Sequence, residues 1–497
     1  MSANTHNGLA PVNWIKKQVV TRQMASPFGV LLLCLLALGI GFLVVIDHAE
    51  IAIGLSAVIT GIIIVFFCLT RPLIGFYITI GIAFMAFYPG RVIGRDLPIS
   101  TGLEVLFVLL FIGTIRFTST EKKQNLLLTP VSIALAVYTF FFLAQFFNPE
   151  MQSKTGWIFF FRRYMMFLLI YVIAYRLIDT KEKARTFFKF WVWLAFGTAL
   201  YGCKQQWFGM FQFEWNSVMQ NPLEYKLLFQ GGFLRKFSFL SDAPSFGILC
   251  GSMSVFTLIL ALNEENKRRK WMYYFFVLIM AMGMTYSGSR TTVIMIPGGI
   301  ALYGLMTINN KRTLLTLFGL ALILLVLLFG PFSSPALNRM RTAFQSKEES
   351  LNVRTENRKY IQPYIYAHPF GSGMATTGVD GERFNPNHEL AGFPPDSGLL
   401  KYALETGWIG YILIMLFYFV VLYQGIYYFF RTRDPECKTY LAAITVTIFT
   451  LVITLFSTVS IGQIPGVIFF YSMLAIMKRL HEFGGLSGNT KMITDYE

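Results

Sequence analysis

The chain alternates between long apolar runs and short polar segments over most of its 497 residues. A helix that crosses the hydrocarbon core of a bilayer needs roughly 20 apolar residues, and the pattern predicts about fourteen such spans. They lie near residues 28–46, 51–69, 73–89, 101–117, 129–147, 157–175, 187–204, 244–262, 271–287, 291–307, 313–330, 407–430, 439–457 and 461–478. We therefore expect an all-α polytopic membrane protein with about 12–14 transmembrane helices.

The composition agrees with this expectation. Hydrophobic residues make up 55% of the chain and charged residues 14%, whereas soluble globular proteins carry roughly 25% charged residues. Basic residues outnumber acidic ones by 42 to 26, but they are spread between apolar runs and form no nucleic-acid-binding motif, so nucleic acid is not expected as a partner. The five cysteines are scattered without a CxxC pair, which is typical of small buried residues rather than metal ligands.

The basic polar segments predict the orientation in the membrane, because short cytoplasmic loops are rich in Lys and Arg. When the N-terminus is placed in the cytoplasm, every second turn should lie there too. These turns contain the basic segments 116–125, 176–185, 263–271, 309–313 and 431–438. Both termini are therefore predicted to be cytoplasmic, and the longest polar stretch to be extracytoplasmic.

This orientation divides the chain into five parts. They are a cytoplasmic segment at 1–27, a helix bundle at 28–330 with an outer loop near 205–243, a large extracytoplasmic loop at 331–406, C-terminal transmembrane helices at 407–478 and a cytoplasmic tail at 479–497. We expect the large loop, which precedes the last three spans, to carry the chemistry.

Several arginines lie on the predicted outer side, where the orientation rule does not require them. They are Arg163 in the outer half of a span, Arg235 beside Lys236 in the first outer loop, Arg290 in a short turn, and Arg354 and Arg358 in the large loop. A guanidinium group offers a planar fork of donors that suits phosphate oxygens. A lipid-linked diphosphate is therefore one interpretation. The alternatives are loop charges in water and side chains that reach toward lipid headgroups.

Four stretches carry a resemblance to a known family. They are "RKFSFLSDAPSFG" (235–247), "SGSRTTVIM" (287–295), "NVRTENRKYIQPYIYAHPFGSG" (352–373) and "DSGLLKYALETGWIGYIL" (396–413). In order, spacing and predicted outer placement, together they resemble the O-antigen ligase and polymerase family of bacterial polysaccharide assembly.

The resemblance implies a GT-C-like membrane glycosyltransferase of the bacterial inner membrane, with its active site facing the periplasm. The donor would be a glycan on undecaprenyl diphosphate, and the acceptor a hydroxyl of another glycan or of lipid A core. No cofactor and no metal would be needed. A chain-length regulator or a flippase is a possible partner. Arg290 and Arg354 would contact the diphosphate, and Arg235, Arg358 and Arg163 are further candidates.

One departure from the family pattern concerns the catalytic base. When Gly407 and Gly410 are aligned with the family's glycines, Asp396 stands where ligases have a histidine. Asp396 is one candidate base, since a carboxylate can accept a proton from a hydroxyl, although it could instead be an N-cap. His388, in "NPNHELAG", is the other candidate and could equally be a plain loop residue.

The missing histidine favours a polymerase over a ligase that transfers glycan to lipid A core. A flippase for lipid-linked glycans is an alternative of another class. Flippases usually show an internal repeat, and no such repeat is visible in this sequence.

Overall fold

The computed structural model describes residues 49–94, 97–117, 129–230, 232–331, 338, 341, 349–395 and 397–485. The chain divides into two units, residues 1–71 and residues 72–497. The first unit contributes one described helix, α3 (Ala49–Thr70), whose sequence is almost wholly apolar. The predicted span at 28–46 and the cytoplasmic segment at 1–27 lie outside the described residues.

The first half of the second unit consists of helices and one small hairpin. Its elements are α4 (Pro72–Phe84), α5 (Tyr88–Ile93), α6 (Ile99–Phe117), α7 (Pro130–Ala144), η3 (Gln145–Phe147), α8 (Lys154–Leu177), α9 (Lys181–Trp207), α10 (Gln212–Gln220), α11 (Pro222–Leu228), β1 (Phe229–Gln230) and β2 (Phe233–Leu234). The two strands pair in antiparallel fashion. The predicted outer loop near 205–243 thus holds two short helices and this hairpin.

The second half is helical throughout its described part. Its elements are α12 (Ala243–Asn263), α13 (Lys267–Tyr286), η4 (Arg290–Ile294), α14 (Met295–Met306), α15 (Lys311–Phe329), α17 (Glu349–Ala367), α18 (Gly378–Phe384), α19 (Gly398–Arg431), α20 (Pro435–Thr454) and α21 (Gly466–Gly485). The all-α fold class is therefore confirmed.

Six described helices are long and apolar enough to cross a membrane. The qualifying stretches are Ile99–Arg116, Pro130–Phe147, Lys154–Leu177, Ala243–Asn263, Gly398–Arg431 and Pro435–Thr454. Shorter apolar helices lie at 58–70, 72–84, 290–306 and 313–323. A multi-pass membrane protein is thus supported, while the full count of 12–14 spans and the side on which each loop lies stay predictions.

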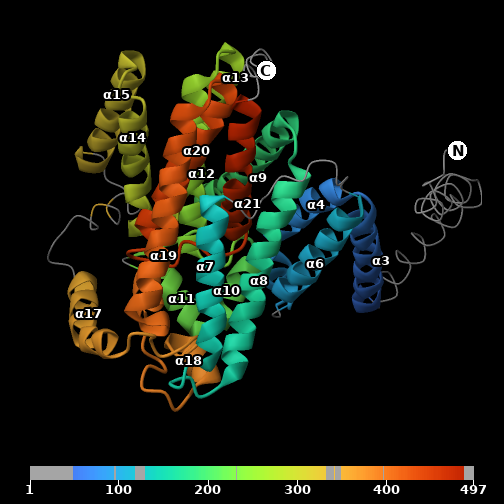
Figure 1. The fold of residues 1–497 in the computed structure, drawn as a ribbon, viewed down its shortest axis with the longest axis vertical. Coiled ribbons are helices and arrows are strands. Elements are labelled where there is room, and N and C mark those ends of the chain that lie inside the picture. Colours follow the sequence, from blue (N-terminus) through green and yellow to red (C-terminus); the bar gives the residue numbers. More distant parts are fainter. Residues whose placement is uncertain are drawn as a thin grey trace, which may run out of the picture. The chain divides into compact units, whose positions relative to one another are not determined.

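Helix α12 forms the centre of the bundle. Nearly all of its side chains are buried, and it packs against α9, α13, α14 and α20, as Figure 1 shows. Small residues allow these close approaches: a Cβ atom on Gly247 would collide with the Ser287 hydroxyl oxygen, and one on Gly251 would lie 2.7 Å from the Met295 sulfur. Close van der Waals contact through small residues is the usual basis of helix association in membranes.

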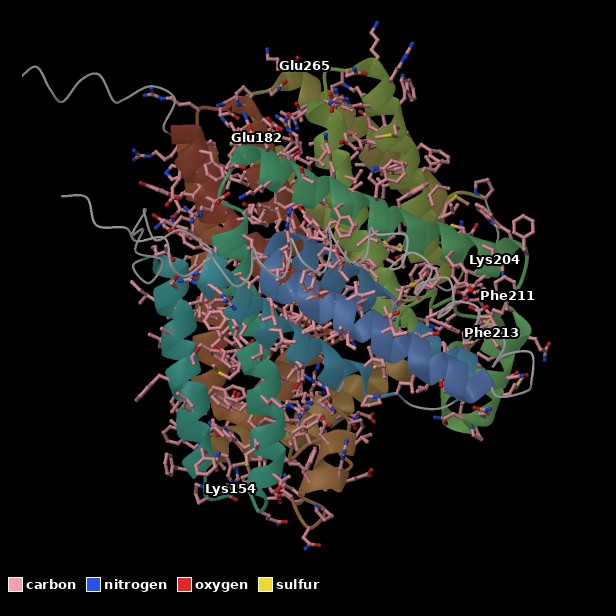
Figure 2. The ribbon with its side chains drawn as sticks, turned by 90° about the vertical axis from the view of Figure 1, so that its right-hand side faces the viewer. Lys154, Glu182, Lys204, Phe211, Phe213 and Glu265 are labelled. Atoms are coloured by element: carbon pink, nitrogen blue, oxygen red, sulfur yellow. The ribbon has the colours of Figure 1, made fainter. Side chains whose placement is uncertain are left out.

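The bundle has two ends that differ in the chain segments they carry. Glu182, at the start of α9, and Glu265, between α12 and α13, lie at one end, and Lys154 lies at the opposite end (Figure 2). We call these the Glu265 end and the Lys154 end. In Figure 1, α18 lies near the lower end of α8, and α17 lies beside the lower part of α19.

The segment predicted as a loop at 331–406 contains regular structure in its described part. It holds α17, α18 and the first residues of α19, which begins at Gly398 rather than near 407. The predicted boundary marks another feature, because Gly407 interrupts the helix with φ 68° and ψ −177°. This backbone conformation favours glycine, because a residue with a side chain is strained at positive φ.

Candidate functional site

Two of the arginine-bearing stretches meet at the end of α12 and α13 that lies away from Glu265. The Nε of Arg235 donates to the carbonyl oxygen of Ser287 at 2.9 Å. The backbone N–H of Lys236 donates to the carbonyl oxygen of Tyr286 at 3.0 Å. Ser287 is three residues before Arg290. The fold therefore brings the segment around Arg235 into contact with the segment that leads to Arg290.

Local hydrogen bonds fix where Arg290 begins its helical turn. The Ser287 hydroxyl donates to the Met284 carbonyl at 2.7 Å and accepts from the Ser289 N–H at 3.2 Å. Together they close the end of α13. Arg290 is then the first residue of η4 and is half-buried. On the facing side, Asp242 caps α12 by accepting from the Ser245 N–H at 2.7 Å, as expected of an N-cap aspartate.

The cations of this region are unusually buried. Arg235 is 9% exposed and Lys236 is 8% exposed. Burial lowers the pKa of Lys236 to about 8, and the Glu214 carboxylate acts in the opposite direction. Desolvation disfavours the charged form of a lysine, so an anionic ligand that pairs with Lys236 would relieve a cost already present in the fold. Lys236 was adjacent to a predicted site residue, but its burial could not be read from the sequence.

The segment from Leu455 to Pro465, which follows α20, connects this region to other parts of the site. The Gln463 side-chain oxygen accepts from the Ser245 hydroxyl at 2.5 Å at the start of α12. The Leu455 carbonyl accepts from the Leu399 N–H at 3.2 Å at the start of α19. The sequence predicted a turn of only a few residues here, because the flanking apolar runs nearly meet.

Arg358 of α17 contacts the same segment. Its Nη2 donates to the Phe456 carbonyl oxygen at 2.9 Å, and its guanidinium carbon lies 4.3 Å from the centroid of the Phe456 ring. Arg358 therefore anchors α17 to the end of α20. Arg354 lies one turn earlier in α17, but the position of its side chain is outside the described residues.

The candidate base Asp396 lies outside the described residues, whereas Ser397 and Gly398, which follow it in sequence, are described. Ser397 caps α19, because its hydroxyl accepts from the Leu400 N–H at 3.1 Å. The alternative that Asp396 is the N-cap is therefore wrong. Gly398 lies against the segment after α20, where an added Cβ atom would be 3.2 Å from the Thr458 carbonyl oxygen. Gly398 therefore contacts the same segment that Arg358 and the start of α12 contact at other residues.

The other candidate base, His388, lies in the connection between α18 and α19. It is 8% exposed, and its Nδ1 accepts from the Leu390 N–H at 3.1 Å, which leaves the proton on Nε2. Burial lowers the pKa of His388, while the Glu389 and Glu150 carboxylates oppose this shift. The imidazole is therefore neutral at neutral pH, a form that can accept a proton only after the tautomer changes or by releasing its bond to Leu390.

The Glu-x-Gly part of the fourth stretch forms a structural joint. Glu405 is 4% exposed, its carboxylate accepts from the Thr377 hydroxyl at 2.7 Å, and Lys401 lies 3.8 Å away. Its backbone carbonyl accepts from the Gly373 N–H at 3.0 Å. A Cβ atom on Gly407 would collide with the Pro369 carbonyl oxygen. The loop before α18 is thereby locked onto α19.

A comparison with known protein families identifies the part of the chain that holds most of these residues. Residues 275–415 match a family model described as O-antigen ligase. The chain carries a domain of the O-antigen ligase family. None of the curated proteins matches the chain. The matched residues include Arg290, α17, α18 and the joint at Gly407, so three of the four stretches that carry the resemblance lie wholly within the domain.

Parts of the site lie outside the O-antigen ligase domain and contact it. Arg235 and Lys236 precede residue 275, and the segment after α20 follows residue 415. Their hydrogen bonds to Ser287 and Leu399 attach them to the domain. The site therefore needs chain segments from both sides of the matched region.

Arg163 does not lie with Arg235 and Lys236, which contact the segment leading to Arg290 in the O-antigen ligase domain. It lies on α8, where its guanidinium carbon is 5.2 Å from the centroid of the Phe159 ring. Arg383 of α18 approaches the same ring at 5.8 Å, and the neighbouring Arg162 pairs with Glu104 at 2.7 Å. Arg163 thus contacts a ring of its own helix that Arg383 of α18 also contacts.

Arg91 is a structural cation that the sequence did not single out. It is 9% exposed, and its guanidinium donates to three carbonyl oxygens of the segment before α12: Ser238 at 3.3 Å, Leu240 at 2.5 Å and Ser241 at 2.9 Å. It therefore holds in place the connection that leads from Arg235 to α12. The only sequence feature that pointed to Arg91 was its position in a turn predicted to lie on the outer side.

Within the described ranges, no group of three or more His, Cys, Asp or Glu side chains is arranged to hold a metal ion. The expected independence from metals and cofactors stays a prediction.

Proposed function

We propose that this protein is a membrane glycosyltransferase that moves a glycan from undecaprenyl diphosphate to a hydroxyl of another glycan. The reaction would take place on the periplasmic face of the inner membrane. The observation that carries the proposal is the contact between the Arg235–Lys236 segment and the segment leading to Arg290, beside a domain of the O-antigen ligase family. Buried, fixed cations are suited to a diphosphate leaving group.

In this mechanism the acceptor hydroxyl oxygen attacks the anomeric carbon of the donor glycan. The bond between that carbon and the diphosphate oxygen breaks, and undecaprenyl diphosphate leaves with the electron pair. Arg290 and Lys236 stabilise the negative charge that develops on the leaving group, because the backbone that carries them is held in place before the reaction begins. Arg235 fixes their relative position through Ser287, and Arg354 is a further diphosphate contact in the proposal.

Asp396 is the proposed base that accepts the proton of the acceptor hydroxyl. Its support is its place in the sequence directly before Ser397 and Gly398, which begin α19 beside the segment that also contacts α12 and α17. His388 is the second candidate. Its Nδ1 is engaged with Leu390, so we rank it below Asp396.

Polymerisation of repeat units is the proposed outcome, since an aspartate stands where the resemblance would place the ligase histidine. Transfer to lipid A core is the other possible outcome. The two are separated by purified protein in proteoliposomes supplied with undecaprenyl-diphosphate glycan, with and without lipid A core. We expect a ladder of products from the glycan alone.

Each other result of this assay has a definite meaning. A single shift that requires lipid A core would identify a ligase. Movement of labelled donor between leaflets without any new glycosidic bond would overturn the transferase and indicate a flippase. A chain-length regulator, added as a second component, would change the length distribution of the ladder without being needed for the first transfer.

A further inference from the structure

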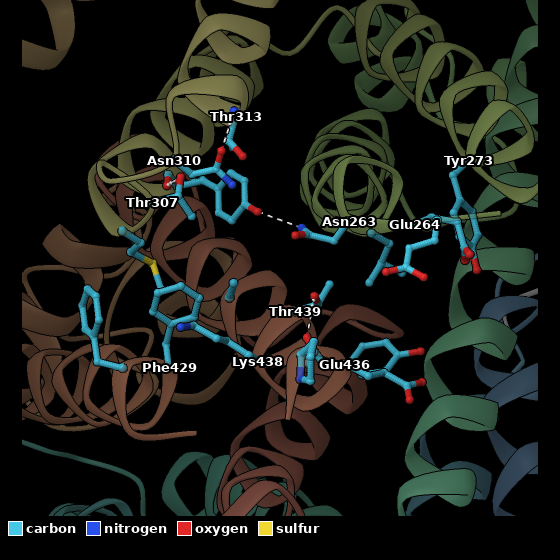
Figure 3. A pocket seen from close by; sticks show the side chains of 18 of the residues that line it. Asn263, Glu264, Tyr273, Thr307, Asn310, Thr313, Phe429, Glu436, Lys438 and Thr439 are labelled. Atoms are coloured by element: carbon cyan, nitrogen blue, oxygen red, sulfur yellow. Dashed lines mark hydrogen bonds between the residues drawn. The ribbon is translucent and has the colours of Figure 1, made fainter. Parts of the chain in front are cut away.

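A large cavity lies at the Glu265 end, remote from the residues proposed for transfer. Its volume is about 1360 Å³, and it lies among the turns between α12 and α13, between α14 and α15, and between α19 and α20 (Figure 3). Asn263 bridges two of its walls by donating to the Tyr303 hydroxyl at 2.8 Å. The volume exceeds that of a typical small-molecule pocket, which is roughly 300–1,000 Å³.

The lining of this cavity carries more positive than negative charge. Five basic residues and three glutamates line it. Glu436 is already paired with Arg185 at 2.5 Å and with Lys181 at 3.1 Å. In the portion of the chain that the structure describes, the remaining cations of the lining have no acidic partner within ion-pair distance. These are Lys189, Arg269, Lys311 and Lys438.

The same cavity has apolar walls that continue onto the surface of the bundle. Phe429, Phe430 and Met306 line it, and Phe430 is 61% exposed. Beside it, α15 packs mainly against α14 and exposes large apolar side chains such as Leu315 and Phe318. The lining therefore combines charged residues with apolar side chains of α14 and α19, and α15 presents further apolar side chains outside the lining.

We propose that this cavity binds the phosphate-bearing headgroup of an anionic phospholipid, with the acyl chains lying along α15 and α19. Lys311, at the start of α15, and Lys438, near the start of α20, both line it, and they would contact the phosphate. Basic pockets between transmembrane helices are suited to anionic headgroups. A free phosphate or nucleotide would use the cations but would leave the apolar walls in contact with water.

Binding would join two parts of the bundle that otherwise have few contacts. A lipid in this cavity would connect α15 to α19 and α20. It would thereby restrict the movement of α14, which packs against α15 and α20. The opposite end of α14 continues directly into η4, which begins at Arg290. The proposal does not rest on the proposed glycosyltransferase function.

The test uses the full chain purified in a neutral detergent. We expect phosphatidylglycerol to raise the thermal unfolding midpoint by several degrees and to remain bound in native mass spectrometry, because a ligand of the folded state stabilises it. Phosphatidylcholine with the same acyl chains should do neither. Equal effects of the two lipids would overturn the proposal, and so would an equal rise with inorganic phosphate alone, which would indicate a free-phosphate site.

Variants locate the effect at this cavity. The double substitution Lys311→Gln and Lys438→Gln should abolish the response to phosphatidylglycerol. The control pair Lys267→Gln and Lys270→Gln carries the same charge change at the same end, outside the lining, and should keep the response. Loss of the response in both pairs would overturn the assignment.

A measurement on the unmodified protein covers the case in which the double variant does not fold. Raising the salt to about 0.5 M shortens the Debye length to roughly 4 Å and weakens contacts between exposed charges. The preference for phosphatidylglycerol over phosphatidylcholine should then shrink severalfold. A preference that salt leaves unchanged would contradict a site built from the exposed Lys311 and the half-buried Lys438.

Discussion

The two ends of the α12–α13 pair hold their cations in opposite ways. Away from Glu265, Arg235 and Lys236 are buried, and Arg235 is fixed by backbone carbonyls. At the Glu265 end, Lys189 and Lys311 are exposed around a wide cavity. Burying a charge costs free energy unless it is paired, whereas an exposed lysine costs little. The first arrangement suits charge that develops at one point during a reaction, and the second suits a headgroup drawn from a fluid bilayer.

The largest effect should follow loss of Arg290. We expect Arg290→Ala to lower the rate of glycan transfer by about 10²–10³-fold, equivalent to about 3–4 kcal/mol of transition-state stabilisation, because a fixed donor at the leaving group would be lost. The assay is product formation in proteoliposomes with extracted donor.

The matched control is Arg268→Ala at the other end of α13. Arg268 is exposed, lies outside the cavity lining, and should be dispensable for transfer. If both variants kept normal transfer, or if both lost it equally, the distinction between the two ends would fail for this reaction.

The second effect concerns the joint that fixes the loop before α18. Gly407→Ala places a side chain at φ 68° and against the Pro369 carbonyl oxygen. We expect a loss of stability of about 3 kcal/mol or more, measured as a lower thermal unfolding midpoint and a lower yield of monodisperse protein. Gly197→Ala is the control, because its added Cβ atom meets nothing within 4 Å. An unchanged midpoint in Gly407→Ala would show that the joint is not rigid.

The sequence was sufficient for the helices but not for the contacts between them. Apolar runs predicted the described spans, because hydropathy and length are local properties. The bond between Arg235 and Ser287 joins residues 52 positions apart, and that between Thr377 and Glu405 joins residues 28 apart. No periodicity encodes such pairs. The segment from Leu455 to Pro465 was mistaken for a brief turn because apolar residues continue through it.

The next effect depends on pH and concerns Lys236. Its pKa is about 8, compared with an ordinary value of 10.5. A bound diphosphate needs the charged form, so the affinity for the donor should fall as pH rises above about 8, by up to roughly tenfold per pH unit. The measurement is the KM for donor between pH 6.5 and 9.5.

The stability of the unbound protein should change in the opposite direction. Between pH 8 and 10.5 the unfolded lysine holds its proton while the folded one has released it, so the contribution of Lys236 to stability rises with pH in this window. Lys236→Arg should remove the break in donor affinity, since arginine stays charged throughout. A break near pH 8 that persists in Lys236→Arg would assign the titration to another group.

The smallest effect should come from Arg358, whose guanidinium is engaged with Phe456 rather than open to a ligand. Arg358→Ala removes one hydrogen bond and one ring contact of α17, worth about 1–2 kcal/mol together. We expect transfer to fall only about two- to fivefold, with faster hydrogen exchange in α17. A loss as large as that of Arg290→Ala, with unchanged exchange in α17, would instead place Arg358 on the diphosphate. The site around Arg290 would then extend across the segment after α20 to α17.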